Sequence, residues 1–100
     1  VLGWGGTYGA IRSAVESAQV EGHNVSHLHI RHLNPLPNNL GDILVKYQKV
    51  LIPELNMGQL SMIIRSKFLF DTIGLNQVQG KPFNTNDILS KITIILKAIN

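Results

Sequence analysis

The sequence alternates between short apolar runs that are typical of strands and longer segments in which apolar residues recur at helical spacing. Strand patterns fall at residues 1–5, 25–33, 50–52 and 72–78, and a helix pattern follows each of them. One strand and one helix therefore recur about every 25 residues, which favours parallel strands joined by right-handed helical crossovers. The sequence predicts an α/β fold in which helices cover both faces of a mostly parallel sheet.

The predicted helices have recognisable starts and ends. Thr7 is expected to cap the first helix, its hydroxyl accepting from a free backbone N–H, and Gly22 is expected to end it. Asn38 or Asn39 should start the second helix, and the Asn56–Gln59 spacing of the third resembles a capping box. Asn84 or Thr85 should start the last helix. The predicted buried stripes are Ala10, Ile11, Ala14, Val15 and Ala18; Leu40, Ile43, Leu44 and Tyr47; Leu60, Ile63, Ile64 and Phe68; and Ile88, Leu89, Ile92, Ile95, Leu96 and Ile99.

Length and composition predict one small domain with a packed core. The chain has 100 residues, of which 44% are hydrophobic and 15% charged,. It contains no cysteine, which excludes disulfides, thiolate-ligated zinc or iron–sulfur centres and a thiol nucleophile,. The net charge of +3 is spread from Arg12 to Lys97, so we expect no nucleic-acid partner,. Apolar runs fall far short of the ~20 residues of a membrane helix, and no signal peptide is visible, so we expect a cytoplasmic location.

The start of the chain is abrupt. Residues 1–5 (VLGWG) already have the character of a buried strand that runs into a turn. We therefore expect residues 1–100 to form a single domain excised from a longer polypeptide, with a function that depends partly on the rest of that polypeptide.

Partners and ligands of an open α/β sheet meet the loops at the carboxyl ends of its strands. Three predicted loops have this position, at residues 5–8, 32–37 and 54–58. The candidate interface or crevice residues in or beside these loops are Gly5, Thr7, Tyr8, Arg31, Asn34, Pro35, Glu54, Asn56 and Gln59.

The first loop is rich in glycine and invites comparison with a dinucleotide-binding turn. Glycines let the backbone approach a phosphate, and the following helix N-terminus favours an anion. The spacing of Gly3, Gly5 and Gly9 is G-x-G-x-x-x-G, however, and the second strand does not end on an acidic residue. A nucleotide site and a turn that serves packing alone both remain open.

The second strand carries His27 and His29 at positions i and i+2, which share one face of a strand,. Paired imidazoles suit zinc, copper or iron, but a third ligand is missing and Arg31 would place a positive charge beside the metal. The alternative is two polar histidines on a half-covered strand. Arg31 could equally form a salt bridge, cap a helix carboxyl end or anchor a subunit interface.

Glu54 at the end of the third strand is the candidate for acid–base chemistry in the third loop. Burial could raise its pKa enough for a general base. The alternative is a helix-capping and interface role shared with Leu55 and Asn56. We assign no catalytic, cofactor-binding or metal-ligating residue in the segment, since no Ser-His-Asp set can be assembled.

Four motifs, taken together, resemble one known family. They are residues 4–12 (WGGTYGAIR), 28–37 (LHIRHLNPLP), 50–60 (VLIPELNMGQL) and 78–83 (VQGKPF). In this order they resemble the carboxyl-terminal part of the alpha subunit of 2-oxoacid:ferredoxin oxidoreductases, especially the 2-oxoglutarate type. Gly6 departs from the pattern, because the family usually places serine there.

The resemblance implies a fold similar to the transketolase carboxyl-terminal domain. That fold is a three-layer α/β/α sandwich around a mostly parallel sheet with strand order 2-1-3-4. An additional antiparallel edge strand is expected upstream of the segment. The reversal of strand order would fall between the loops at residues 5–8 and 54–58.

The resemblance also implies a function. The parent enzymes oxidatively decarboxylate a 2-oxoacid with coenzyme A and reduce ferredoxin, using thiamine diphosphate, magnesium and an iron–sulfur cluster held in other domains or in the beta subunit. The segment is thus predicted to be a noncatalytic assembly domain that contacts the rest of its alpha subunit and the thiamine-binding beta subunit. Two alternatives remain: a small nucleotide-binding domain that uses residues 3–9, and a stand-alone interaction module.

Overall fold

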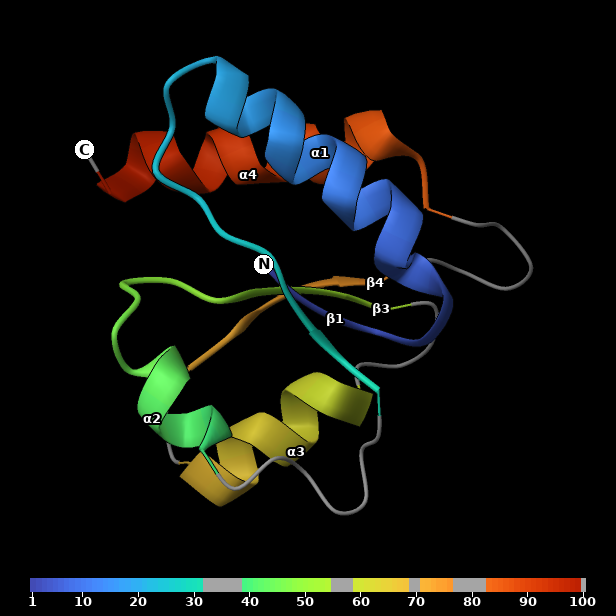
Figure 1. The fold of residues 1–100 in the computed structure, drawn as a ribbon. Helices are drawn as coiled ribbons and strands as arrows, with labels where there is room; N and C mark the ends of the chain where they lie inside the picture. Colours follow the sequence, from blue (N-terminus) through green and yellow to red (C-terminus); the bar gives the residue numbers. More distant parts are fainter. Residues whose placement is uncertain (32–38, 55–58, 69–70, 77–82, 100) are drawn as a thin grey trace.

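Parallel strands form the middle layer of the protein (Figure 1). The computed structural model describes residues 1–31, 39–54, 59–68, 71–76 and 83–99. The strands in this part of the chain are β1 (Leu2–Trp4), β2 (Leu28–Ile30), β3 (Leu51–Glu54) and β4 (Ile73–Asn76). β1 pairs in parallel with β2, and β3 pairs in parallel with β4. These two pairs agree with the expected strand neighbours, and β1 and β3 lie side by side. The complete strand order 2-1-3-4 stays a prediction.

Helices cover both faces of the strands, which confirms the predicted three-layer α/β/α architecture. α1 (Tyr8–Val20) and α4 (Thr85–Ile99) pack together on one face, and α2 (Leu40–Leu44) and α3 (Gln59–Phe68) lie on the other (Figure 1). β1 leads through a single 3-10 turn, η1 (Gly5–Thr7), into α1.

Two hydrophobic clusters hold the layers together. Leu51 belongs to the cluster beneath α1 and α4, and its neighbours Val50 and Ile52 belong to the cluster beneath α2 and α3. Because alternate residues of a strand point to opposite faces, a continuous apolar run serves both clusters. The buried members are Leu2, Ile30, Leu40, Leu44, Val50, Ile52, Leu60 and Ile64 on one side, and Ile11, Ala14, Val15, Ala18, Leu51, Phe83, Ile88 and Ile92 on the other.

The predicted end of α1 is confirmed and its predicted cap is wrong. Gly22 has a φ of 91°, and its N–H donates to the Gln19 carbonyl over 3.0 Å,. The Thr7 hydroxyl does not cap α1 but donates to the Trp4 carbonyl over 3.0 Å. Thr7 is the last residue of η1, and the carbonyl that accepts its hydrogen bond belongs to Trp4, the residue that precedes this turn.

Other element boundaries differ locally from the predictions. α2 ends at Leu44, so Tyr47, predicted to be buried in its stripe, lies beyond the helix and is 49% exposed. β2 is restricted to three residues because its partner β1 has only three. α4 starts at Thr85, and the side-chain oxygen of Asn84 accepts from the Asn86 N–H over 2.8 Å. Within the described ranges no helix is both long enough and apolar enough to cross a bilayer.

Candidate functional site

Glu54 ends β3 with a carboxylate that is buried at the amino end of α3. Its side chain is 1% exposed. Oε1 accepts hydrogen bonds from the Leu60 N–H over 2.6 Å and the Trp4 indole Nε1 over 3.1 Å, and Oε2 accepts from the Ser61 N–H over 3.2 Å. Helix N-termini carry partial positive charge and free N–H donors, so they favour a carboxylate. The helix-capping part of the role predicted for Glu54 is confirmed, and the interface part stays a prediction.

This arrangement bears on the general-base alternative for Glu54. Both carboxylate oxygens accept hydrogen bonds from donors of the protein itself, so neither oxygen is left without a partner inside the fold,. The geometry therefore favours the capping role over proton abstraction. The capping box was predicted for Gln59 with Asn56; Gln59 is the first residue of α3, and Asn56 lies outside the described residues.

Trp4 is the residue at this site that the sequence did not reveal as functional. It lies at the carboxyl end of β1, fifty positions from Glu54, and its indole bridges the two strand ends. A partly buried indole N–H requires an acceptor. The presence of a tryptophan in a strand expected to be buried was therefore the one sign in the sequence that Trp4 needs a polar partner.

The glycine-rich loop after β1 has structural reasons for two of its glycines. A Cβ at Gly3 would overlap the end of the buried Ile11 side chain of α1 and would lie 3.1 Å from Nδ1 of His29, so these side chains would have to shift. Gly5 has a φ of 64°, in the left-handed region that favours glycine,. Gly6 and Gly9 are exposed and have open space around their α-carbons.

The side chains of Tyr8, His27 and His29 form a cluster beside this loop. The Tyr8 ring centroid lies 5.3 Å from that of His27 and 5.1 Å from that of His29, and the two imidazoles are 5.6 Å apart. Nε2 of His29 is 3.2 Å from the Gly5 carbonyl oxygen, which can only accept, so this nitrogen is the donor,. Burial lowers the pKa of His27, and the nearby His29 and Arg12 lower it further.

The pair of histidines shows little of the character of a metal site. The described residues do not bring together three or more His, Cys, Asp or Glu side chains in a ligating arrangement. An iron–sulfur cluster does not fit the chain, because the sequence offers no thiolate,.

The remaining candidates are distributed along the carboxyl edge. Arg31 directly follows β2 and is exposed, and Tyr8 is 46% exposed at the start of α1. Asn34 and Pro35 lie outside the described residues. The structure therefore brings Gly5, Thr7 and Tyr8 together beside β1 and connects this loop to Glu54 through Trp4.

No protein-family profile matches the sequence. Over 88 residues, the chain is 44% identical to the 2-oxoglutarate oxidoreductase subunit KorA of Mycobacterium tuberculosis, a match that spans 88% of this chain and 14% of that protein. The fold matches a 2-oxoglutarate:ferredoxin oxidoreductase from Magnetococcus marinus whose structure has 2-oxoglutarate, coenzyme A and succinyl-CoA bound. The TM-score is 0.86 at 30% identity, over 93% of this chain and 17% of that one.

Both relatives are subunits or chains of an oxidoreductase, and both are much longer than the segment that they share with this chain. Agreement in sequence over most of this chain, together with agreement in fold, indicates common descent. The chain is homologous to a segment of the alpha-type subunit of 2-oxoglutarate:ferredoxin oxidoreductases.

Proposed function

We propose that this segment is a noncatalytic assembly domain of a 2-oxoglutarate:ferredoxin oxidoreductase. The observation that carries the proposal is that Glu54 and Thr7 are hydrogen-bonded inside the fold, and that Nε2 of His27 and Nδ1 of His29, which have no hydrogen-bond partner among the described residues, are themselves buried. Glu54 caps α3, the Thr7 hydroxyl donates to Trp4, and Nε2 of His29 donates to Gly5. Groups held in this way stabilise a surface, and they are not free to act on a substrate.

The parent complex would oxidatively decarboxylate 2-oxoglutarate to its acyl-CoA product and pass the electrons to ferredoxin. Thiamine diphosphate, magnesium, the iron–sulfur cluster and coenzyme A would be held by other domains or by the beta subunit. The partners of this segment would be the rest of its own alpha subunit and the thiamine-binding beta subunit, in the cytoplasm. The length of both relatives outside the shared segment supports this division of roles.

A graft tests the proposal. This chain replaces the 88-residue matching segment of the Mycobacterium tuberculosis subunit, and the hybrid is produced with its partner subunit. We expect the hybrid to assemble and to reduce ferredoxin in the presence of 2-oxoglutarate and coenzyme A, whereas the 100-residue chain alone is inactive. Turnover by the chain alone, or a hybrid that folds but never joins its partner, would contradict an assembly role.

A further inference from the structure

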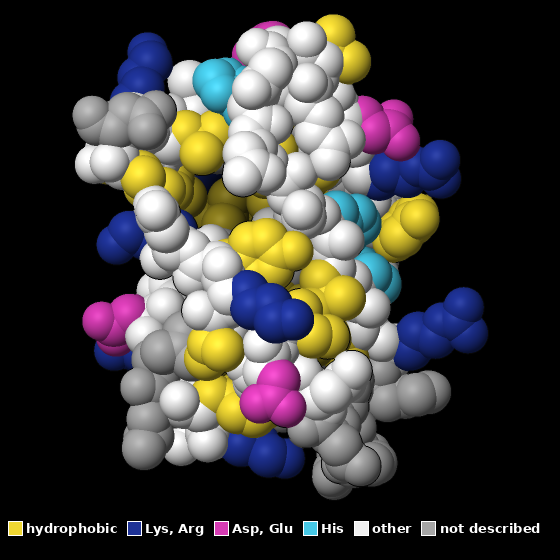
Figure 2. Space-filling view, turned by 60° about the vertical axis from the view of Figure 1, so that its left-hand side comes forward, with side chains coloured by type: hydrophobic (Ala, Val, Ile, Leu, Met, Phe, Trp, Pro, Cys, Tyr) yellow, Lys and Arg dark blue, Asp and Glu magenta, His cyan; other side chains and the backbone are white. Residues whose placement is uncertain are grey.

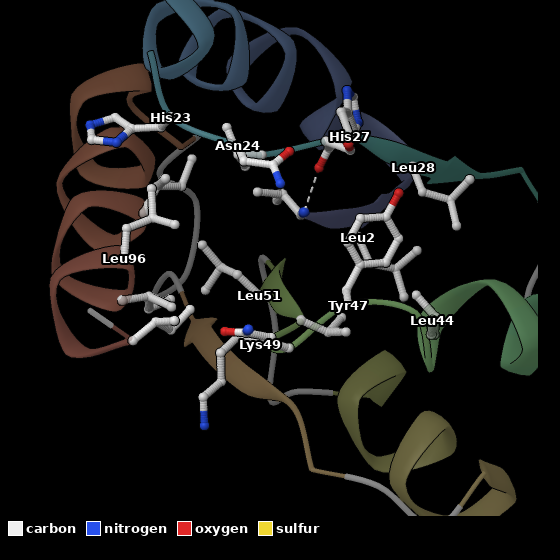
Figure 3. A pocket seen from close by; sticks show the side chains of 18 of the residues that line it. Leu2, His23, Asn24, His27, Leu28, Leu44, Tyr47, Lys49, Leu51 and Leu96 are labelled. Carbon is white, nitrogen blue, oxygen red and sulfur yellow. Dashed lines mark hydrogen bonds between the residues drawn. The ribbon is translucent and has the colours of Figure 1, made fainter. Parts of the chain in front are cut away.

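A cavity opens at the amino ends of the strands, whereas Glu54 lies at their carboxyl ends. The cavity volume of about 570 Å³ is in the size range of sites that bind small molecules or side chains,. Residues at strand starts, including Leu2, Leu28 and Leu51, contribute to its wall. Figure 2 shows the corresponding face with a hollow that has hydrophobic side chains inside it, and Figure 3 shows the lining from close by.

The apolar part of the cavity arises because the apolar stripe of α4 continues beyond its buried section. Ile88 and Ile92 are buried in the cluster with α1. One turn later, Ile95, Leu96 and Ile99 are only half-buried, and all three line the cavity. Apolar surface left at the end of a stripe is available for a partner to bury.

The wall across from α4 comes from the segment that follows α2. Leu44 and the exposed Tyr47 lie across the cavity from Leu96, with Leu51 between them (Figure 3). Tyrosine offers an apolar ring and a polar hydroxyl, a combination that suits recognition of polypeptides.

The charged side chains that line the cavity are Lys46 and Lys49, and no Asp or Glu contributes to the lining among the described residues. His23 and His27 also line the cavity, but burial lowers the pKa of His27, so this imidazole adds no positive charge near neutral pH. Both lysines are exposed. Glu21 lies 3.6 Å from His23 but is not part of the lining. An apolar floor with a basic rim is complementary to apolar side chains that alternate with carboxylates.

We propose that this cavity is a docking site for a polypeptide segment in which apolar side chains are flanked by acidic ones. The inference rests on the proposed assembly role: neighbouring parts of a subunit would be linked covalently to this domain and present at high effective concentration. Amide side chains of Asn24 and Gln48 in the lining supply hydrogen-bonding groups for an extended backbone,.

Peptide binding to the 100-residue chain tests the docking site directly. The probes are two fluorescein-labelled peptides of equal length, one of alternating leucine and glutamate and one of alternating leucine and lysine, measured by fluorescence anisotropy. We expect the acidic peptide to bind at least about tenfold more tightly. The double variant K46E/K49E should remove this preference, and L96A should weaken both peptides by removing apolar contact without adding a charge. The matched control R65E/K67E, on α3 and outside the lining, should keep the preference.

The other outcomes are decisive as well. Equal binding of the two peptides, no binding of either, or an equal effect of R65E/K67E would overturn the proposal. Decanoate that binds where the acidic peptide does not would assign the cavity to a small amphiphile and would also overturn it.

The same variants in the hybrid subunit separate this inference from the assembly proposal. K46E/K49E should lower the yield of correctly assembled hybrid at least about fivefold relative to R65E/K67E. A hybrid that assembles equally well with either variant would refute the docking site while leaving the assembly role intact. A hybrid that never assembles would refute the assembly role, and peptide binding would still decide the docking site.

Discussion

The indole Nε1 of Trp4 donates a hydrogen bond to the Glu54 carboxylate over 3.1 Å and thereby joins the carboxyl ends of β1 and β3. The two strands lie side by side but belong to separate hydrogen-bonded pairs. The same carboxylate caps α3, so one side chain connects β1, β3 and the helix layer on one face.

Replacing Glu54 with glutamine should cost about 2 to 3 kcal/mol of unfolding free energy. Glutamine keeps the shape but replaces one accepting oxygen with a donor, which faces either the Ser61 N–H or the N–H groups of Leu60 and Trp4. Urea unfolding followed by circular dichroism measures the loss. Trp4→Phe removes this donor together with part of a ring that packs against the cluster beneath α2 and α3, and should cost about 1 to 3 kcal/mol,. The double variant should cost less than the sum. A fully additive double variant would show that the two residues are not coupled.

Gly3→Ala should destabilise the chain by about 1 to 3 kcal/mol, because the new methyl group overlaps the end of the buried Ile11 side chain and forces it to repack,. Gly6→Ala is the matched control in the same loop, since nothing lies within 4 Å of its added Cβ. Thermal unfolding of both variants checks the contrast. If the two midpoints fall equally, close packing is not the reason for Gly3.

Stability should fall on acidification because the pKa of His27 is lowered in the folded state. Below the ordinary histidine pKa of about 6.5, the unfolded chain binds a proton that the folded chain resists, so unfolding becomes easier as the pH falls. His29 and Tyr8 contact this imidazole, and the Val1 amino group and Arg12 act on it electrostatically. Burial lowers the pKa of the Val1 amino group to about 6, so this group adds to the acid response in every variant. His27→Gln should therefore lose less stability than the unaltered chain between about pH 7.5 and about pH 5.

The comparison for this prediction is His23→Gln, at a histidine that lies 3.6 Å from the Glu21 carboxylate. Urea unfolding at both pH values gives the free energies. An unchanged acid response in His27→Gln would show that other groups cause it.

Arg31→Ala should weaken assembly of the hybrid subunit while changing the unfolding free energy of the chain by less than about 0.5 kcal/mol. Arg31 is exposed at the end of β2, where an interface anchor would lie,. Analytical ultracentrifugation of the hybrid with its partner subunit measures association. A loss of chain stability with normal assembly would show that Arg31 is structural.

Calorimetric titration of the chain with NAD, ADP or coenzyme A should give no saturable heat below about 1 mM. Gly3 makes room for the Ile11 side chain, and Gly5 adopts the positive φ of the turn. The Thr7 hydroxyl donates to the Trp4 carbonyl, so the loop has structural reasons for the residues that a nucleotide site would use. Micromolar binding that is abolished in Gly6→Val would instead support the nucleotide alternative for residues 3–9.

The sequence by itself determined the class of fold, most of the helices and the core. The helical period of apolar residues depends only on local backbone geometry, and it predicts the buried Leu60 and Ile64 on α3 and Ile88 and Ile92 on α4,. Leu51 and Ile52 alternate between two clusters for the same reason. Gly22 ends α1 because of a conformational freedom that belongs to the residue itself,. The four motifs also sufficed to identify the homologous family.

Only the tertiary structure decided which partners the polar groups take. The choice between capping and catalysis for Glu54 depends on the N–H groups of Leu60 and Ser61, and on Trp4, which the fold brings near from fifty positions away. Thr7 turns to a carbonyl of β1 because η1 tightens the turn. Tyr47 is exposed, and lines a cavity together with Leu96, because α2 ends early while α4 continues. Such contacts depend on how whole layers pack, and no periodicity within one segment encodes them.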